Sequence, residues 1–292
     1  MAGALALLMS DDEPAENISG GSAGGGLAAE FDEHEAETRA EAVVDRLGER
    51  YWQKAYGGQD AFECLVRTIL SQNTSDKASQ PAHDALMDRY GDGTDLAVAL
   101  ADAEQSALAE TIESAGLYNQ KSKTMIAIAE RVVDEYGSVD ASGEDASDSE
   151  TESRPAEEFD AFVTEEDPAT VRETLLDFSG VGPKTADCVL LFSGGRAGVF
   201  PVDTHVHRIY RRLGIAAPDA DHEGVREVLE AQVPAEKCGF GHTASIQFGR
   251  EYCTARKPAC LDDPEACPMA DLCEQVGVYP ATGEVTDPAE AD

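Results

Sequence analysis

A lysine and an aspartate flank a short predicted helix in the most informative stretch of the sequence. Gly180 and Gly182 form a turn, and Pro183 suits the first position of a helix, because its fixed φ fits and its missing N–H would have no partner there. Lys184 follows at the positive end of that helix, so we expect the macrodipole to lower its pKa. A neutral amine is a nucleophile that can form a Schiff base, and Asp203 places a carboxylate beyond the helix and the next loop.

The same turn could bind an anion. A helix that ends at Gly180 and another that begins near Pro183 form a helix–turn–helix hairpin. Free N–H groups at a glycine turn and a helix N-terminus suit a phosphate group. A plain turn between two helices with a surface lysine is the alternative, and the residues by themselves leave both open.

Four of the seven cysteines lie close together near the end of the chain. Soft thiolate ligands at this loop spacing suit either Zn²⁺ or an iron–sulfur cluster, and ligand chemistry does not decide between them. An odd cysteine total with this clustering is not the framework of a secreted disulfide protein. The predicted metal ligands are Cys253, Cys260, Cys267 and Cys273.

Two short blocks resemble a known family. Residues 180–186, Gly-Val-Gly-Pro-Lys-Thr-Ala, and residues 202–205, Val-Asp-Thr-His, resemble the helix–hairpin–helix and Gly/Pro-Asp loop of base-excision DNA glycosylases, most closely the endonuclease III branch. The resemblance implies that Lys184 attacks the sugar C1′ and that Asp203 assists. Ser179 departs from the usual proline of the family, which changes the turn and leaves the chemistry intact.

The resemblance also assigns residues that contact DNA. It implies that an amide side chain fills the gap left by a flipped base; Asn73 matches that position by register, and Gln72 beside it is the alternative. Leu117, in a turn, would wedge into the duplex opposite the extruded base. Without the resemblance, these segments also fit a polar turn and a leucine folded onto the core. The remaining predicted DNA contacts are Gly180, Gly182, His205, Arg256 and Lys257.

The cysteine segment carries its own resemblance. Residues 250–260 are similar to the cluster loop of endonuclease III, which implies a [4Fe–4S] cluster, with Zn²⁺ as the alternative. Six residues, 261–266, separate the second and third cysteines, where the family has two. We expect cluster geometry to tolerate this longer loop.

Apolar residues recur at helical spacing along the chain, and no alternating strand pattern of useful length occurs. We therefore expect an all-α fold, and the resemblance implies the two-lobed helix–hairpin–helix glycosylase fold. A six-helix barrel lobe would span residues 58–197, with an acidic, solvated insertion at about 138–167. A cluster lobe would combine residues 35–57 and 198–275, leaving residues 1–34 as a disordered leader and residues 276–292 as an acidic tail.

The chain of 292 residues has a formal net charge of −36 and a pI near 4.3. By itself this charge argues against a polyanionic partner, because phosphate binding normally needs Lys and Arg. Acid this widespread indicates adaptation to high internal salt, where counterion release no longer drives DNA binding. Affinity would then depend on hairpin amides, wedged side chains and pocket contacts. Acidic tails on an ordinary cytosolic protein are the alternative explanation.

We expect a cytoplasmic monomer with no membrane association. The short apolar run at residues 2–9 has no preceding positive charge and no clear cleavage site. No other stretch approaches membrane-spanning length.

The predicted function is that of a base-excision repair glycosylase with abasic-site lyase activity on damaged, oxidised pyrimidines. Its partner would be double-stranded DNA that contains damaged bases or abasic sites. One alternative is a mismatch-specific thymine or uracil glycosylase of the same superfamily. The other is a non-catalytic helix–hairpin–helix DNA-binding protein with a zinc tail.

Overall fold

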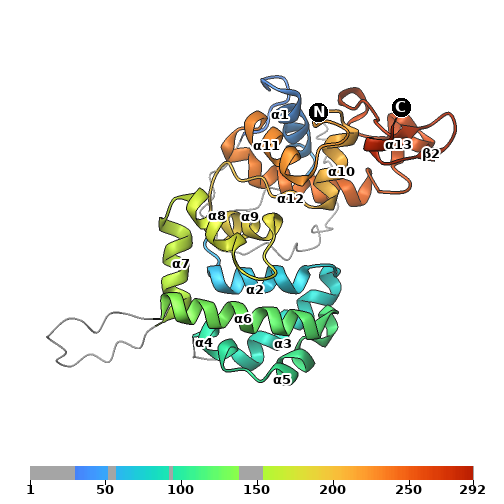
Figure 1. The fold of residues 1–292 in the computed structure, drawn as a ribbon. Coiled ribbons are helices and arrows are strands. Elements are labelled where there is room, and N and C mark those ends of the chain that lie inside the picture. Colours follow the sequence, from blue (N-terminus) through green and yellow to red (C-terminus); the bar gives the residue numbers. More distant parts are fainter. Residues whose placement is uncertain (1–29, 52–56, 92–94, 138–153, 292) are drawn as a thin grey trace, which may run out of the picture.

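The structure is a computed structural model that describes residues 30–51, 57–91, 95–137 and 154–291. It is built almost entirely from helices, as the sequence predicted (Figure 1). Among the described residues, no helix combines the length and the apolar character that crossing a membrane requires.

One hydrophobic core is formed by the helices between residues 61 and 199. The central helix α2 (Ala61–Ser71) begins at Asp60, whose side chain accepts a hydrogen bond from the N–H of Glu63, and it buries apolar residues on most of its surface. It contacts α3, α6, α7 and α9. The other elements are α3 (Asp76–Tyr90), α4 (Leu96–Ala101), α5 (Gln105–Thr111), η1 (Glu113–Ala115), α6 (Tyr118–Tyr136), α7 (Pro155–Glu165), α8 (Pro168–Leu176) and α9 (Pro183–Phe192).

A second core joins the N-terminal helix to the C-terminal third of the chain. Helix α1 (Arg39–Gly48) packs on α12 (Ala235–Glu251), where the buried Lys237 pairs with Glu41 at 2.8 Å and Asp45 at 2.7 Å. The other elements are α10 (Thr204–Arg212), α11 (His222–Gln232), α13 (Ala259–Asp262), η2 (Pro264–Ala266), η3 (Ala270–Leu272), β1 (Val278–Tyr279), β2 (Glu284–Val285) and η4 (Pro288–Glu290).

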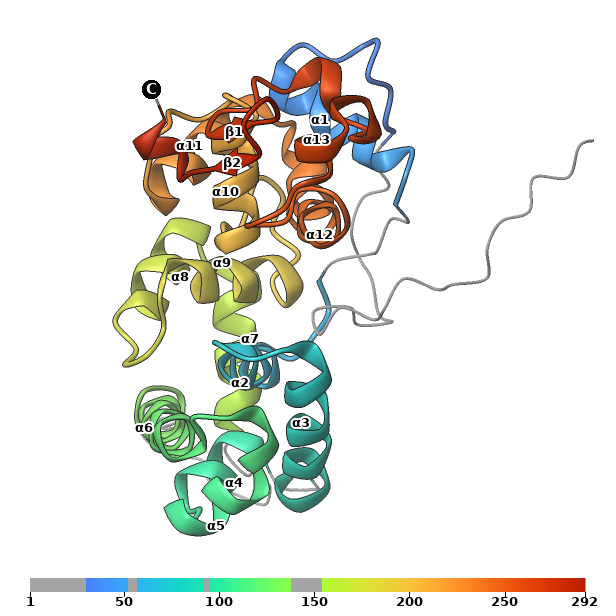
Figure 2. The ribbon, with the colours of Figure 1, turned by 90° about the vertical axis from the view of Figure 1, so that its right-hand side faces the viewer.

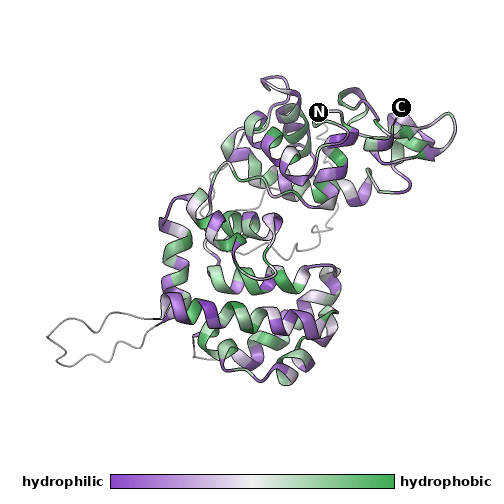
Figure 3. Cartoon of the chain, viewed as in Figure 1, coloured by the Kyte–Doolittle hydropathy of each residue, from purple (hydrophilic) through white to green (hydrophobic). Residues whose placement is uncertain are grey.

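Helices α8 and α9 lie between the two cores in both views (Figures 1 and 2). The chain passes from the first core to the second between Val199 and Phe200. Arg172 on α8 joins the two sides, since it pairs with Asp187 on α9 at 2.6 Å and with Glu223 on α11 at 2.8 Å. Hydrophobic residues run along most of α9 (Figure 3), as expected for a helix covered on several sides.

We predicted a solvated insertion at residues 138–167, and this prediction is wrong for residues 155–165. Residues 155–165 form α7, and Phe159 and Val163 are fully buried in the first core. These residues follow helical spacing, but the surrounding Asp and Glu hid the pattern at the sequence level. Residues 138–153 lie outside the described residues.

The predicted leader and tail also need correction at their inner ends. Of the leader, residues 1–29 lie outside the described part, but Phe31 packs on Phe240 with ring centroids 4.5 Å apart. In the tail, β1 and β2 pair as a short antiparallel hairpin, and Asp287 forms an ion pair with Arg211 on α10. Apolar burial and ion pairs, Glu33 with Arg46 in the leader and Asp287 with Arg211 in the tail, therefore hold segments whose composition indicated solvation.

Candidate active site

The glycine turn joins α8 to α9 as a hairpin. Gly180 has φ +84°, and a Cβ built there would lie 2.7 Å from Cγ2 of Thr124 on α6, so both backbone conformation and packing require glycine. Gly182 is exposed at the N-cap of α9, with nothing within 4 Å of a built Cβ. Its open surroundings leave the backbone at the start of α9 accessible to an anion.

Lys184 lies in the first turn of α9 and is partly exposed. Burial lowers its pKa, but Cys188, one helical turn further on, and Asp203 raise it, and the net direction is upward. The expectation of a lowered pKa was therefore wrong. Burial raises the pKa of Cys188, so this thiol stays protonated at neutral pH and Asp203 is the charged partner of the lysine.

Asp203 is the N-cap of α10. Its Oδ1 accepts hydrogen bonds from the N–H of His205 at 2.8 Å and of Val206 at 2.9 Å. These bonds fix the carboxylate at the end of a helix. Its charge acts on the pKa of Lys184, so the structure brings the two predicted catalytic residues together from different helices.

His242 is a further residue at this site, and no sequence pattern indicated it. It lies on α12, 1% exposed, with its ring centroid 6.2 Å from that of Phe192 on α9. Burial lowers its pKa to about 4, with the charges of Asp203 and Lys184 also acting on it. Its Nδ1 has no hydrogen-bond partner among the described residues. The imidazole of His242 is therefore neutral at pH 7, its Nδ1 can accept a hydrogen bond, and it lies close enough to Lys184 and Asp203 for their charges to act on it.

Two predicted DNA contacts have left-handed backbone conformations without being glycine. Asn73 has φ +53° and Leu117 has φ +49°. Asn73 is exposed, and Leu117 is the one exposed large hydrophobic residue of the described chain, at 56%. Strain of this kind costs of order 1–3 kcal/mol for each residue and is concentrated at functional sites.

Gln72 has a different position from Asn73. Its Nε2 donates to the carbonyl oxygen of Gly180 at 3.2 Å and to Oγ1 of Thr185 at 3.1 Å. This side chain is therefore held against the hairpin, whereas Asn73 faces solvent.

His205 and the cysteine loop are joined by Arg208. The Arg208 guanidinium lies 3.2 Å from Nδ1 of His205 and donates to the carbonyl oxygen of Cys253 at 2.8 Å. His205 is half-buried, and burial lowers its pKa. Arg256 and Lys257 are exposed on the same loop, where Lys257 pairs with Asp262 at 3.0 Å.

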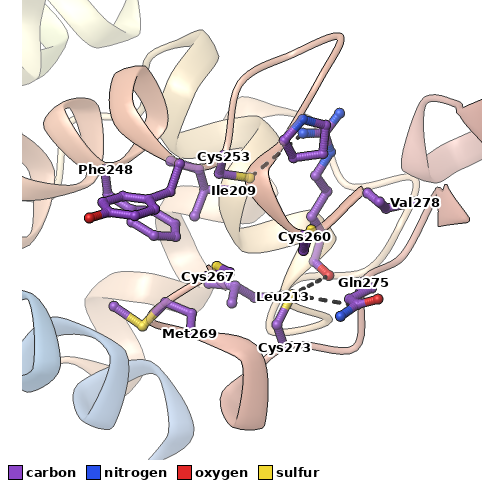
Figure 4. A pocket seen from close by; sticks show the side chains of 13 residues that line it. Ile209, Leu213, Phe248, Cys253, Cys260, Cys267, Met269, Cys273, Gln275 and Val278 are labelled. Atoms are coloured by element: carbon purple, nitrogen blue, oxygen red, sulfur yellow. Dashed lines mark hydrogen bonds between the residues drawn. The ribbon is translucent and has the colours of Figure 1, made fainter. Parts of the chain in front are cut away.

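The four predicted cysteine ligands line one cavity (Figure 4). Its walls are mainly apolar, and burial raises the pKa of Cys267 to about 11 and of Cys273 to about 12. Two N–H groups point at the sulfurs: Arg212 donates to Sγ of Cys253 at 3.6 Å, and the N–H of Gln275 donates to Sγ of Cys273 at 3.3 Å. Soft ligands, N–H···S bonds and an apolar wall are the surroundings that suit an iron–sulfur centre.

The long spacing between Cys260 and Cys267 does not separate them. The extra residues fold into α13 and η2, and both cysteines reach the same cavity.

Comparison with known proteins identifies these two regions. Residues 66–235 match the HhH-GPD superfamily of base excision DNA repair proteins, and residues 253–273 match the iron–sulfur binding domain of endonuclease III. Endonuclease III from Bacillus subtilis is 30% identical over 73% of this chain and 81% of its own length. Endonuclease III from Sulfolobus acidocaldarius is 29% identical over 74% of this chain and 82% of its own length.

Solved structures confirm the fold. A trapped endonuclease III–DNA covalent intermediate has a TM-score of 0.62 and 24% identity over 82% of this chain and 96% of that chain. A thermostable thymine-DNA glycosylase has a TM-score of 0.61 and 21% identity over 81% of this chain and 96% of that chain. The first family match covers more than half of the sequence, and the chain therefore belongs to the HhH-GPD superfamily of base excision DNA repair glycosylases.

Proposed function

We propose that this glycosylase is bifunctional: it removes oxidised pyrimidines from double-stranded DNA and cleaves the strand at the resulting abasic site. The pairing of Lys184 at the start of α9 with Asp203 at the start of α10 carries this proposal. A lysine at this position can do more than activate water, because its amine can itself bond to the sugar.

The base must first leave the stack, because C1′ is unreachable inside a duplex. Asn73 and Leu117 would enter the duplex, and their exposure on strained loops supports this role. The exposed backbone at Gly182 and the charges of Arg256 and Lys257 would contact phosphate.

The amine of Lys184 then attacks C1′ while the bond between C1′ and the base breaks. Because the pKa of Lys184 is raised, its ammonium must lose a proton before it can attack. Asp203 is placed to accept that proton or to stabilise positive charge on the sugar. The C1′–O4′ bond then breaks, O4′ takes up a proton, and the opened sugar is held to Lys184 as a protonated imine. This imine allows a proton to leave C2′ and the 3′ phosphate to depart, which is β-elimination.

We also propose that Cys253, Cys260, Cys267 and Cys273 hold a [4Fe–4S] cluster. When bound, the cluster would supply a structural and electronic centre next to the DNA-facing loop. The four thiols line one cavity, and the family model that matches residues 253–273 is an iron–sulfur binding domain, which supports a cluster over one Zn²⁺.

The test is borohydride trapping of the purified protein on duplexes that contain an abasic site, thymine glycol or a G·T mismatch. Trapping at low and high salt also tests the salt adaptation that the composition indicates. We expect a covalent adduct that Lys184→Ala abolishes while DNA binding survives. Lys123→Ala is the matched control, because this lysine is exposed on α6, a different helix from the one that carries Lys184.

Each outcome assigns a different activity. Strand cleavage retained in Lys184→Ala would exclude Lys184 as the nucleophile. Adducts on the mismatch duplex and none on thymine glycol would replace oxidised pyrimidines with mismatched thymine as the substrate. Base release without any adduct would leave a monofunctional glycosylase.

A further inference from the structure

Lys121 is a buried lysine that the proposed mechanism does not use. It lies on α6, 4% exposed, and burial lowers its pKa. Among the described residues no carboxylate lies within ion-pair distance of it. Its Nζ instead donates to the carbonyl oxygen of Leu70 at 2.7 Å and to that of Ala115 at 2.9 Å. A buried ammonium is costly, so its retention at this position needs an explanation.

The two acceptors terminate two different helical segments. Leu70 is in the last turn of α2 and Ala115 ends η1. Carbonyl oxygens at helix C-termini carry partial negative charge and lack intrahelical partners, so one cation can satisfy both. Lys121 therefore joins the end of α2, 51 residues away from it in sequence, to the end of η1.

Each acceptor lies close in sequence to a strained, exposed residue. Asn73 comes three residues after Leu70, and Leu117 comes two residues after Ala115. A second bond ties the same loops, since Oγ1 of Thr74 donates to the Ala115 carbonyl. Asn73, the proposed gap-filling amide, and Leu117, the proposed wedge, thus extend from two loops that are joined through the carbonyl of Ala115 and the ammonium of Lys121.

The joined loops are also attached to the hairpin. Gln72, next to Asn73, donates to Gly180 and to Thr185, one residue after Lys184. Through the short backbone segment from Leu70 to Gln72, the hydrogen bonds of Lys121 and of Gln72 therefore connect the loop of Leu117 to the helix that carries Lys184.

We propose that Lys121 is a positioning residue for base extrusion: its ammonium fixes the spacing between Asn73 and Leu117, so that both enter the duplex as one unit. This inference rests on the proposed function of those two residues. A lysine that only stabilised the fold would affect every substrate equally, whereas a positioning lysine affects those that need extrusion from a stack.

The test compares Lys121→Met with Lys123→Met, which alters an exposed lysine on the same helix. Binding is measured to a duplex with a tetrahydrofuran abasic analogue and to the same duplex undamaged. Borohydride trapping is measured on an abasic site in duplex and in single-stranded DNA. Two lost bonds to a charged donor predict roughly a tenfold or greater fall in lesion preference and in duplex trapping. Single-stranded trapping should stay unchanged, because no stack is opened.

An equal fall on single-stranded and duplex DNA would overturn the inference, as would no fall on either. Wild-type protein that never traps would remove the lyase proposal, while the binding ratio would still test the inference. Should Lys121→Met not fold, Thr74→Val removes only the hydroxyl bond to Ala115. We expect a smaller loss of lesion preference from Thr74→Val, and an unchanged preference would overturn the proposed role.

Discussion

Arg212 donates a hydrogen bond to Sγ of Cys253 at 3.6 Å and, from the same guanidinium, to the carbonyl oxygens of Thr254 and Ala255 at 2.7 Å each. The side chain is 3% exposed and lies on α10, the helix that begins at Asp203. One arginine therefore holds the cysteine loop and donates to the sulfur of a proposed cluster ligand.

This contact predicts an effect on the iron–sulfur centre. An N–H···S bond stabilises the more negative, reduced form, so Arg212→Lys should lower both the reduction potential and the iron content. Visible absorbance per protein and protein-film voltammetry would measure the two. Arg211→Lys is the control, because Arg211 pairs with Asp287 instead. Equal potentials in wild type and Arg212→Lys would show that the bond has no electronic effect.

Leu117 should matter to extrusion and not to stability. Because its side chain is 56% exposed, Leu117→Ala should change the free energy of unfolding by no more than about 0.5 kcal/mol. Base release from duplex DNA should slow sharply, since no wedge fills the stack. Single-turnover kinetics on duplex and single-stranded lesions, with urea unfolding, would check both. Duplex rates equal to wild type would exclude the wedge role.

His242 should make the fold sensitive to mild acid. Its pKa is about 4 in the folded chain and about 6.5 when unfolded, so the unfolded state binds the proton first as pH falls. Stability should therefore fall between about pH 6.5 and pH 4, by about 3 kcal/mol in total. Urea unfolding of wild type and His242→Asn across this range should show a shallower slope for the variant. His34→Asn, at an exposed position, is the control; parallel curves for wild type and His242→Asn would contradict this assignment.

Lys237 on α12 pairs with Glu41 and Asp45 on α1, and loss of these ion pairs should destabilise the second core strongly. Lys237→Met would leave Asp45, which is 0% exposed, without its partner, at a cost of roughly 3–5 kcal/mol. Arg39→Met breaks the exposed pair with Glu274 and should cost about 1 kcal/mol or less. Thermal and urea unfolding of both variants would measure the contrast, and equal losses would show that burial does not set the cost.

Local sequence motifs predicted the candidate catalytic and metal-binding residues of this protein. The turn at Gly180, the carboxylate at Asp203 and the set of four cysteines each depend on short segments, so residue type and spacing predict them. Helix α7 was missed because acidic residues alternate with the apolar ones that are buried. The raised pKa of Lys184 was missed because it depends on neighbours from other turns and another helix, which a macrodipole argument does not include.

The sequence by itself therefore determined the family, the helical fold and the candidate groups for catalysis and metal binding. Only the tertiary structure showed that Gln72 is held against the hairpin and that two residues no pattern indicated take part: His242 near Asp203 and Lys121 between two loops. The physical reason is that each of these residues gains its role from partners far along the chain. Burial and hydrogen bonding of that kind exist only after the helices have packed.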